Sequence, residues 1–301
     1  MYKVVVLLST YNGEKYLEQQ LDSLLAQTEQ NIFIVARDDG SSDRTTEILD
    51  HYAAGGRLRW YTGENLGPER SFLDLLKNCD EGQYYAFCDQ DDYWHPDKLE
   101  SALALLEKEP ADTPLLYFGK KRLVDENLQP LPREDIQVRT TCYGCAVLNG
   151  VAFGCTMVFN QALRALFRPF SPRHKYMHDV LLYRTAAAVG RVIYDPQPHI
   201  DYRQHGGNVV GANRSGWEKW KMRFQTLFQR RHDHSRSQCA GDILEAFGDR
   251  MGEADRKLTE QLAMSPSSLS ERLGLLFNRR LTAQNPADML AWRVFILLGW
   301  I

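Results

Sequence analysis

The chain has 301 residues, of which 44% are hydrophobic and 25% are charged, so it is long enough to bury a substantial core. Its 39 acidic residues outnumber 36 basic ones, and the formal net charge of −3 gives no reason to expect a nucleic-acid partner. No run reaches the roughly 20 apolar residues of a membrane-spanning helix, and six cysteines in a chain of this length indicate reduced thiols.

A strand-like apolar run, residues 4–8, begins almost at the N-terminus, with no charged-then-apolar leader before it. We therefore expect a protein that is synthesised and retained in the cytoplasm. Attachment to the inner face of the cytoplasmic membrane remains open, because a peripheral contact needs no spanning helix.

Apolar runs that predict strands alternate with helical patterns through the first third of the chain. The expected strands are residues 3–8, 32–36, 58–61 and 84–88. After the first strand, for example, Leu17, Leu21 and Leu24 recur at helical spacing. Repeated strand–loop–helix units predict a mostly parallel, right-handed, doubly wound α/β sheet.

The fourth expected strand is aromatic-rich and is followed at once by Asp89, Asp91 and Asp92. Three carboxylates within four positions repel one another, and a cation among them would relieve that repulsion. An all-oxygen ligand set favours Mg²⁺ or Mn²⁺. For Asp92, helix capping or local packing is an equally good interpretation.

Three other polar loops follow the first three expected strands and would lie at the same edge of the sheet. They carry Thr10 with Tyr11, Asp39, and Asn65. Open α/β sheets bind ligands at the carboxyl ends of their strands. Neither a GxGxxG nor a GxxxxGK[ST] motif occurs, so the dinucleotide and P-loop explanations lack their phosphate-binding glycines.

The middle of the chain predicts strands at residues 115–119 and 151–159, separated by a proline-rich segment, residues 125–143. That segment suits either a substrate loop or a plain surface insertion. Asp179 heads an apolar helix expected over residues 180–189, where a carboxylate is often just a cap. Further short strands are expected at residues 192–194 and 199–202.

Six motifs, in this order and spacing, resemble the family 2 glycosyltransferases of the GT-A fold, especially their bacterial rhamnosyltransferase-like branch. They are STYNG at residues 9–13, DDGSSD at 38–43, NLG at 65–67, DQDDYW at 89–94, MHD at 177–179 and YRQHGGNVVGA at 202–212. The resemblance implies inverting transfer of a sugar from a nucleoside diphosphate donor to an acceptor hydroxyl. It also implies dTDP-L-rhamnose as the donor, in the synthesis of a bacterial surface polysaccharide or lipopolysaccharide.

On the donor side, the resemblance implies that Thr10 and Tyr11 flank the nucleotide base and that Asp39 hydrogen-bonds it. Asn65 is expected in the same nucleotide-sugar site. Asp89 would face the ribose or the metal shell. Two arginines, Arg70 and Arg203, are expected as diphosphate partners.

On the catalytic side, the resemblance implies that Asp91 ligates Mg²⁺ or Mn²⁺ and that His205 completes the metal shell or touches the diphosphate. Asp179 matches the catalytic base, although this family often has Glu where this chain has His178. Trp94 could stack on an acceptor sugar, and packing at a helix start is an equal alternative.

Two rival functions remain from the residues alone. A phosphatase of the haloacid dehalogenase type also places DxD after an apolar strand, but that class needs its acids after the first strand. A nucleotide-sugar-binding scaffold without turnover is the other rival. The intact Asp179 argues only weakly against the scaffold.

Beyond residue 212 the resemblance fades, so we predict a catalytic domain over residues 1–212 and a helical region over 213–301. Residues 217–228 place aromatic side chains on one helical face, and residues 214–231 carry six basic and one acidic residue. Residues 289–301 are also strongly apolar. These segments suit contact with a membrane surface near a lipid-linked saccharide acceptor, docking on the main domain, or contact with a second copy.

Overall fold

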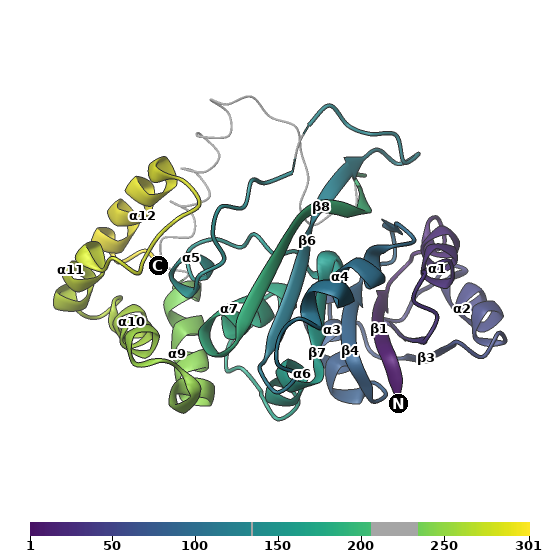
Figure 1. The fold of residues 1–301 in the computed structure, drawn as a ribbon, viewed down its shortest axis with the longest axis horizontal. Coiled ribbons are helices and arrows are strands. Elements are labelled where there is room, and N and C mark those ends of the chain that lie inside the picture. Colours follow the sequence, from purple (N-terminus) through teal and green to yellow (C-terminus); the bar gives the residue numbers. More distant parts are fainter. Residues whose placement is uncertain (134, 206–233) are drawn as a thin grey trace.

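A computed structural model describes residues 1–133, 135–205 and 234–301 (Figure 1). Within these ranges, eight strands form one sheet in the order β3-β2-β1-β4-β7-β6-β8-β5. Helices cover both faces of this sheet, which confirms the predicted α/β class.

The first half of the sheet is parallel and follows the expected alternation. Its elements are β1 (Tyr2–Thr10), α1 (Leu17–Leu25), β2 (Ile32–Asp38), α2 (Thr45–Ala53), β3 (Leu58–Thr62), α3 (Pro68–Asn78) and β4 (Gly82–Cys88). Strand β1 lies between β2 and β4 and pairs in parallel with both, and β2 pairs in parallel with β3. The loops that follow these strands therefore meet at one edge.

The second half of the sheet contains the two strands that run against the others. Its elements are β5 (Tyr93–Trp94), α4 (Lys98–Leu106), β6 (Leu115–Val124), α5 (Tyr143–Ala146), η1 (Gly154–Thr156), β7 (Met157–Asn160), α6 (Gln161–Phe167), α7 (His178–Val189) and β8 (Arg191–Arg203). Strand β7 is antiparallel to β4 and β6, and β5 is antiparallel to β8. The sheet is thus mostly parallel, as predicted.

Two strand predictions from the sequence were wrong in their bounds. The strand expected from residue 151 begins only at Met157, because the preceding residues form the short 3₁₀ helix η1. The two short strands expected at 192–194 and 199–202 are one strand, β8. Pro196 and Pro198 lie within this strand, opposite shifts in the β6–β8 register between Gly119 and Arg122.

Alternate residues of β1 enter different halves of the core. Val4 and Val6 pack with α1, α2 and α4 on one face, whereas Val5 and Leu7 pack with α3, α6 and α7 on the other. This period-2 division is what a strand buried on both faces requires. It explains why the first strand is a continuous apolar run.

The C-terminal helices α9 (Ser235–Phe247), α10 (Glu253–Met264), α11 (Leu269–Phe277) and α12 (Pro286–Leu298) lie beyond α7, at the opposite end of the molecule from α1 and α2 (Figure 1). Ile243, Leu258 and Phe295 belong to the same hydrophobic cluster as β1 and α7. These helices therefore dock on the main domain. The predicted boundary at 212 and the amphipathic segment 217–228 lie outside the described residues.

The last two helices each expose large hydrophobic side chains at helical spacing. These are Leu269, Leu273 and Phe277 on α11, and Leu290, Val294, Leu297 and Leu298 on α12. Among the helices in the described ranges, none combines the length and apolar character that crossing a bilayer requires.

Candidate active site

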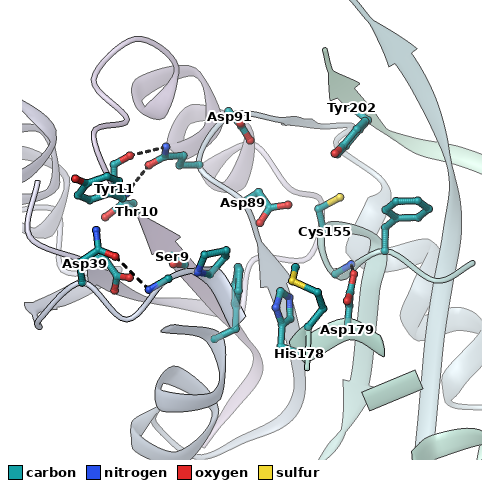
Figure 2. Close-up of a pocket in the computed structure, with 18 residues that line it drawn as sticks. Ser9, Thr10, Tyr11, Asp39, Asp89, Asp91, Cys155, His178, Asp179 and Tyr202 are labelled. Carbon is teal, nitrogen blue, oxygen red and sulfur yellow. Dashed lines mark hydrogen bonds between the residues drawn. The ribbon is translucent and has the colours of Figure 1, made fainter. Parts of the chain in front are cut away.

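A cavity of about 360 Å³ opens at the edge of the sheet where β1 and β4 end, facing the start of α7 (Figure 2). It brings together seven residues expected from the sequence: Thr10, Tyr11, Asp39, Asn65, Asp89, Asp91 and Asp179. Tyr11 and Asp39 lie on one side of it, and His178 and Asp179 lie on the other. Acids far apart in the chain therefore share one cavity.

The side formed by the loops after β1, β2 and β3, here called the polar wall, is held by hydrogen bonds. Thr10 donates its hydroxyl to Asp38 Oδ1 at 3.1 Å, and Asp38 Oδ2 accepts the N–H of Ser41 at 2.8 Å. Asp39 pairs with the buried Arg37 and accepts the N–H of Leu66 at 3.1 Å. Asp38 thus shapes the loop, while Asp39 reaches the cavity.

A side-chain amide ties the polar wall to the acidic loop after β4. Gln90 accepts the N–H of Tyr11 at 2.8 Å and donates to the Tyr11 carbonyl at 3.0 Å (Figure 2). A Cβ at Gly13 would lie 2.3 Å from Gln90 Oε1, so a larger residue there would displace the Gln90 amide. Gln90 could not be singled out from the sequence, because no local pattern predicts a partner 79 positions away.

The acidic loop uses its three carboxylates differently. Asp91 Oδ2 lies 2.8 Å from His205 Nε2, at the cavity. Asp92 is fully buried and its Oδ1 accepts the N–H of Arg203 at 3.2 Å. Burial, followed by the charges of Asp91 and Asp89, raises the pKa of Asp92 well above its usual range. Asp92 therefore follows the packing alternative left open for it.

Asp89 also lines the cavity, between the other acids. Burial, and then the charges of Asp91 and Asp179, raise the pKa of its carboxyl group. A cation bound among these acids would oppose that shift, because it favours their ionised forms. This electrostatic strain is the feature of the loop that most suits a divalent metal.

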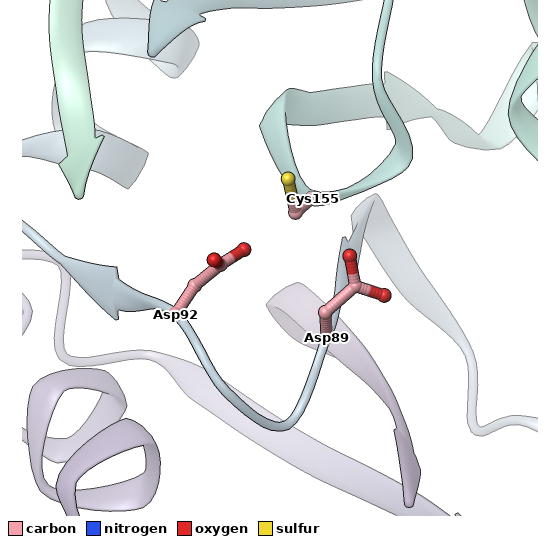
Figure 3. A group of neighbouring side chains, drawn as sticks. All are labelled: Asp89, Asp92 and Cys155. Carbon is pink, nitrogen blue, oxygen red and sulfur yellow. The ribbon is translucent and has the colours of Figure 1, made fainter. Parts of the chain in front are cut away.

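Two separate groups of side chains near the acidic loop could hold a metal ion. Asp91 and His205 offer a carboxylate and an imidazole in contact with each other, which fits Mn²⁺ and, through the carboxylate, Mg²⁺. Ligand atoms of Asp89, Asp92 and Cys155 also lie within 4.8 Å of one another (Figure 3). A thiol in that second group suits softer metals better than Mg²⁺.

A buried lysine lies beside this second group. Lys98 donates to the Cys155 carbonyl at 2.6 Å, and burial lowers its pKa to about 7. The Lys98 ammonium places a positive charge near Asp89 and Asp92 without a metal ion. The first group, Asp91 with His205, is therefore the better match to a hard divalent cation.

Besides His205, which is linked to the cavity through its contact with Asp91, three residues expected at the site do not line it. Arg203 is buried behind the acidic loop, where its Nε donates to the Asp91 carbonyl at 2.8 Å and its Nη2 donates to Gln19 Oε1 at 2.9 Å. Arg70 is exposed on α3 and is not among the cavity residues. Arg203 therefore braces the loop that carries Asp91 and does not face the cavity, and the role of Arg70 as a diphosphate partner stays a prediction.

Trp94 is the third of these residues. Its side chain is fully buried with α1 and α4, and the Lys98 ammonium lies 3.1 Å from its ring centre. A ring that is closed off in this way is not available to stack on a sugar. The packing alternative replaces the acceptor role.

The opposite side of the cavity, here called the α7 wall, is built around the first turn of that helix. Asp179 Oδ1 accepts the N–H of Val180 at 2.6 Å, and its Oδ2 accepts the N–H of Gly154 at 3.2 Å. The sequence indicated Asp179 but missed its neighbours on this wall. These are Phe72, Phe153, Gly154, Cys155, Met177, His178 and Tyr202.

A mostly parallel α/β sheet with an acidic loop after its fourth strand, and a later carboxylate across one cavity, is the arrangement that the resemblance to the GT-A glycosyltransferases implies. Residues 5–167 match the family model described as "Glycosyl transferase family 2", and the chain belongs to this family. The phosphatase rival is thereby removed, and its acids would in any case follow the first strand rather than β4.

Relatives and solved structures agree with this assignment. The dTDP-rhamnosyl transferase RfbG of Shigella flexneri is 30% identical over 237 residues, which cover 71% of this chain and 77% of the relative. The uncharacterized glycosyltransferase RT0329 of Rickettsia typhi is 26% identical over 227 residues, covering 72% and 69%. The crystal structure of S. aureus TarS 1-349 in complex with UDP-GlcNAc has a TM-score of 0.60 at 19% identity, covering 99% of this chain and 82% of that chain.

Proposed function

We propose that the protein transfers L-rhamnose, with inversion, from dTDP-L-rhamnose to a hydroxyl of a saccharide or lipid-linked saccharide acceptor. The product would belong to a bacterial surface polysaccharide or lipopolysaccharide. One observation carries the proposal: Asp89, Asp91 and Asp179 open onto a single cavity. The similarity to a dTDP-rhamnosyl transferase supports the choice of donor.

Asp179 would act as the general base. Inversion needs a proton acceptor on the face of the sugar opposite the leaving group, and carboxylates are ionised at neutral pH. The bonds from the Gly154 and Val180 N–H groups fix the direction of this carboxylate at the cavity. A fixed carboxylate can take the acceptor's proton as the new glycosidic bond forms.

Asp91 and His205 would hold Mg²⁺ or Mn²⁺, with Asp89 beside them. The cation would stabilise the negative charge that grows on the departing nucleoside diphosphate. Arg203 keeps the backbone of Asp91 in place, and Lys98 offsets the buried acids. These residues therefore organise the leaving-group side of the reaction.

The polar wall would bind the nucleotide. Thr10 and Tyr11 would flank the base, Asp39 would accept a hydrogen bond from it, and Asn65 lies in the same part of the cavity. Asp39 is held by Arg37 and by the Leu66 N–H, so its position is set before any ligand arrives. Such preorganisation lowers the entropy cost of binding.

The exposed apolar face of α11 and α12 would contact the inner surface of the cytoplasmic membrane, close to a lipid-linked acceptor. The alternative is contact with a second copy of the chain. Because the C-terminal helices share the main core, point substitutions test this face better than truncation does. Replacing Leu290 and Leu297 by Asp should abolish flotation with anionic liposomes, and unchanged flotation would remove the membrane proposal.

Incubation with a panel of nucleotide sugars, Mg²⁺ or Mn²⁺ and candidate acceptors tests the reaction itself. Nucleotide release that depends on both acceptor and metal is the expected result, and it should be fastest with dTDP-L-rhamnose. Binding of a nucleotide sugar without release would favour the non-catalytic scaffold. Equal turnover without metal would remove the cation from the proposal.

A further inference from the structure

His178 precedes Asp179 and occupies an unusual place between the helix and the sheet. Its ring lies 4.1 Å from the ring of Phe72 on α3 and 4.8 Å from that of Phe87 on β4, measured between centroids. The side chain is only 4% exposed. The ring therefore fills the space where α7, α3 and β4 meet.

Hydrogen bonds do not explain why this ring is held there. Among the described residues, neither nitrogen of His178 has a hydrogen-bond partner. A buried polar atom without a partner costs stability. What fixes the ring is its shape and its contact with the two phenylalanines.

The same ring limits what can stand at residue 154. A Cβ built on Gly154 would lie 2.5 Å from His178 Nε2, closer than real Cβ contacts allow. The backbone of Gly154 is not in the left-handed region, so the ring, and not the backbone dihedral, is what demands glycine here. Gly154 and His178 thus form a close contact between η1 and α7.

This contact bears directly on Asp179, since the Gly154 N–H donates to Asp179 Oδ2 at 3.2 Å. His178 stands next to Asp179 in the first turn of α7, and its ring lies against Gly154, so one side chain adjoins both ends of this hydrogen bond.

We propose that His178 is a positioning residue whose ring, wedged between Phe72, Phe87 and Gly154, holds the Asp179 carboxylate in its working direction. The inference rests on the proposed role of Asp179 as the base. It assigns a function to the position at which this family often has Glu, and that function depends on ring shape rather than on charge.

The electrostatics agree with a role based on shape. Burial, opposed in part by the charges of Asp179 on the same helix and Glu69 on α3, lowers the pKa of His178 to about 4. The ring is therefore neutral at physiological pH. A neutral neighbour leaves Asp179 without the repulsion that an adjacent carboxylate would add.

A double-mutant cycle measures the contact without using activity. Gly154→Ala should lower the melting temperature by about 5 °C, in line with overpacking in a chain of this size. In a His178→Ala background the same change should cost much less, because the space is then open. Additive losses would show that the two residues are not coupled, and would overturn the proposal.

Kinetics with the full-length protein then test the consequence for Asp179. His178→Ala should lower kcat about tenfold to a hundredfold and leave the KM for the donor within about twofold. His178→Phe, which keeps the ring, should retain kcat within about threefold. Ala186→Gly, at a buried position seven residues after Asp179 on the same helix, controls for general destabilisation of α7.

Two outcomes are decisive against the proposal. If His178→Phe loses as much kcat as His178→Ala, the ring nitrogens and not the shape carry the role. If both variants keep full kcat, the ring does not position the base. Should the unaltered protein transfer no sugar at all, the proposed function fails, while the melting-temperature cycle still decides whether the wedge exists.

Discussion

The two walls of the cavity are built by different physical means. On the polar wall, Thr10, Asp38 and Asp39 are fixed by short hydrogen bonds and an ion pair within consecutive loops. On the α7 wall, Asp179 accepts two backbone hydrogen bonds, and the ring of the adjacent His178 packs against Phe72 and leaves no room for a Cβ at Gly154. The comparison teaches that side-chain hydrogen bonds and charge hold the polar wall, whereas tight packing accompanies the hydrogen bonds of the α7 wall.

The largest expected effect comes from the α7 wall. Asp179→Asn keeps the shape of the side chain but removes the proton acceptor, so kcat should fall by about 10² to 10⁴-fold. Donor affinity, measured by calorimetry, should change by less than about threefold, because the polar wall is untouched. Full turnover in this variant would remove Asp179 as the base.

The acidic loop should give the complementary result. Asp91→Ala removes a metal ligand, and we expect metal-dependent donor affinity to fall by at least about tenfold to a hundredfold. Donor titrations with and without Mn²⁺ measure the loss. Asp112→Asn changes an exposed acid that does not line the cavity, and it serves as the control. Equal losses of donor affinity in both variants would contradict a specific metal site.

Unfolding at two pH values tests whether the His178 ring on the α7 wall is buried in its neutral form. The unfolded state binds a proton to His178 near pH 6.5 and the folded state only near pH 4, so this residue lowers the stability as the pH falls between those values. Relative to His178→Phe, the unaltered protein should lose on the order of 3 kcal/mol of unfolding free energy across that window. Urea unfolding at pH 7 and pH 4.5 measures the difference. Parallel curves for the two proteins would show that the ring is not buried in its neutral form.

The smallest effect is expected away from both walls. Trp94→Phe replaces a fully buried indole with a smaller ring. It should lower the free energy of unfolding, measured with urea, by about 1 to 2 kcal/mol. The kcat and the acceptor KM should stay within about twofold, because the ring does not reach the cavity. A raised acceptor KM would restore the stacking role that burial argues against.

Local patterns were sufficient for the polar wall and the sheet beneath it. The strands up to β4, the acidic loop and the helix headed by Asp179 all follow from periodicity, spacing and family motifs. Trp94 was undecided from the sequence, because an aromatic residue after an acidic loop suits stacking and packing equally. Only its full burial separates the two.

The α7 wall could not be predicted in the same way. Gly154 appeared only as a break in an expected strand, and His178 only as a departure from a motif. Their contact joins positions 24 residues apart and depends on where η1 and α7 come to rest. The link between Gln90 and Tyr11 was missed for the same reason, since a sequence pattern records spacing and not tertiary contacts.

The direction of β7 determines where the chain between β6 and β7 joins the sheet. Because it runs against β4, the chain enters it at the edge of the sheet where β4 leaves. The segment between β6 and β7, residues 125–156, therefore leaves the sheet and returns to it at the same edge. This segment carries Gly154, whose N–H donates to Asp179, so chimeras that exchange it between family members should alter the α7 wall while strands β1 to β4 keep their sequence.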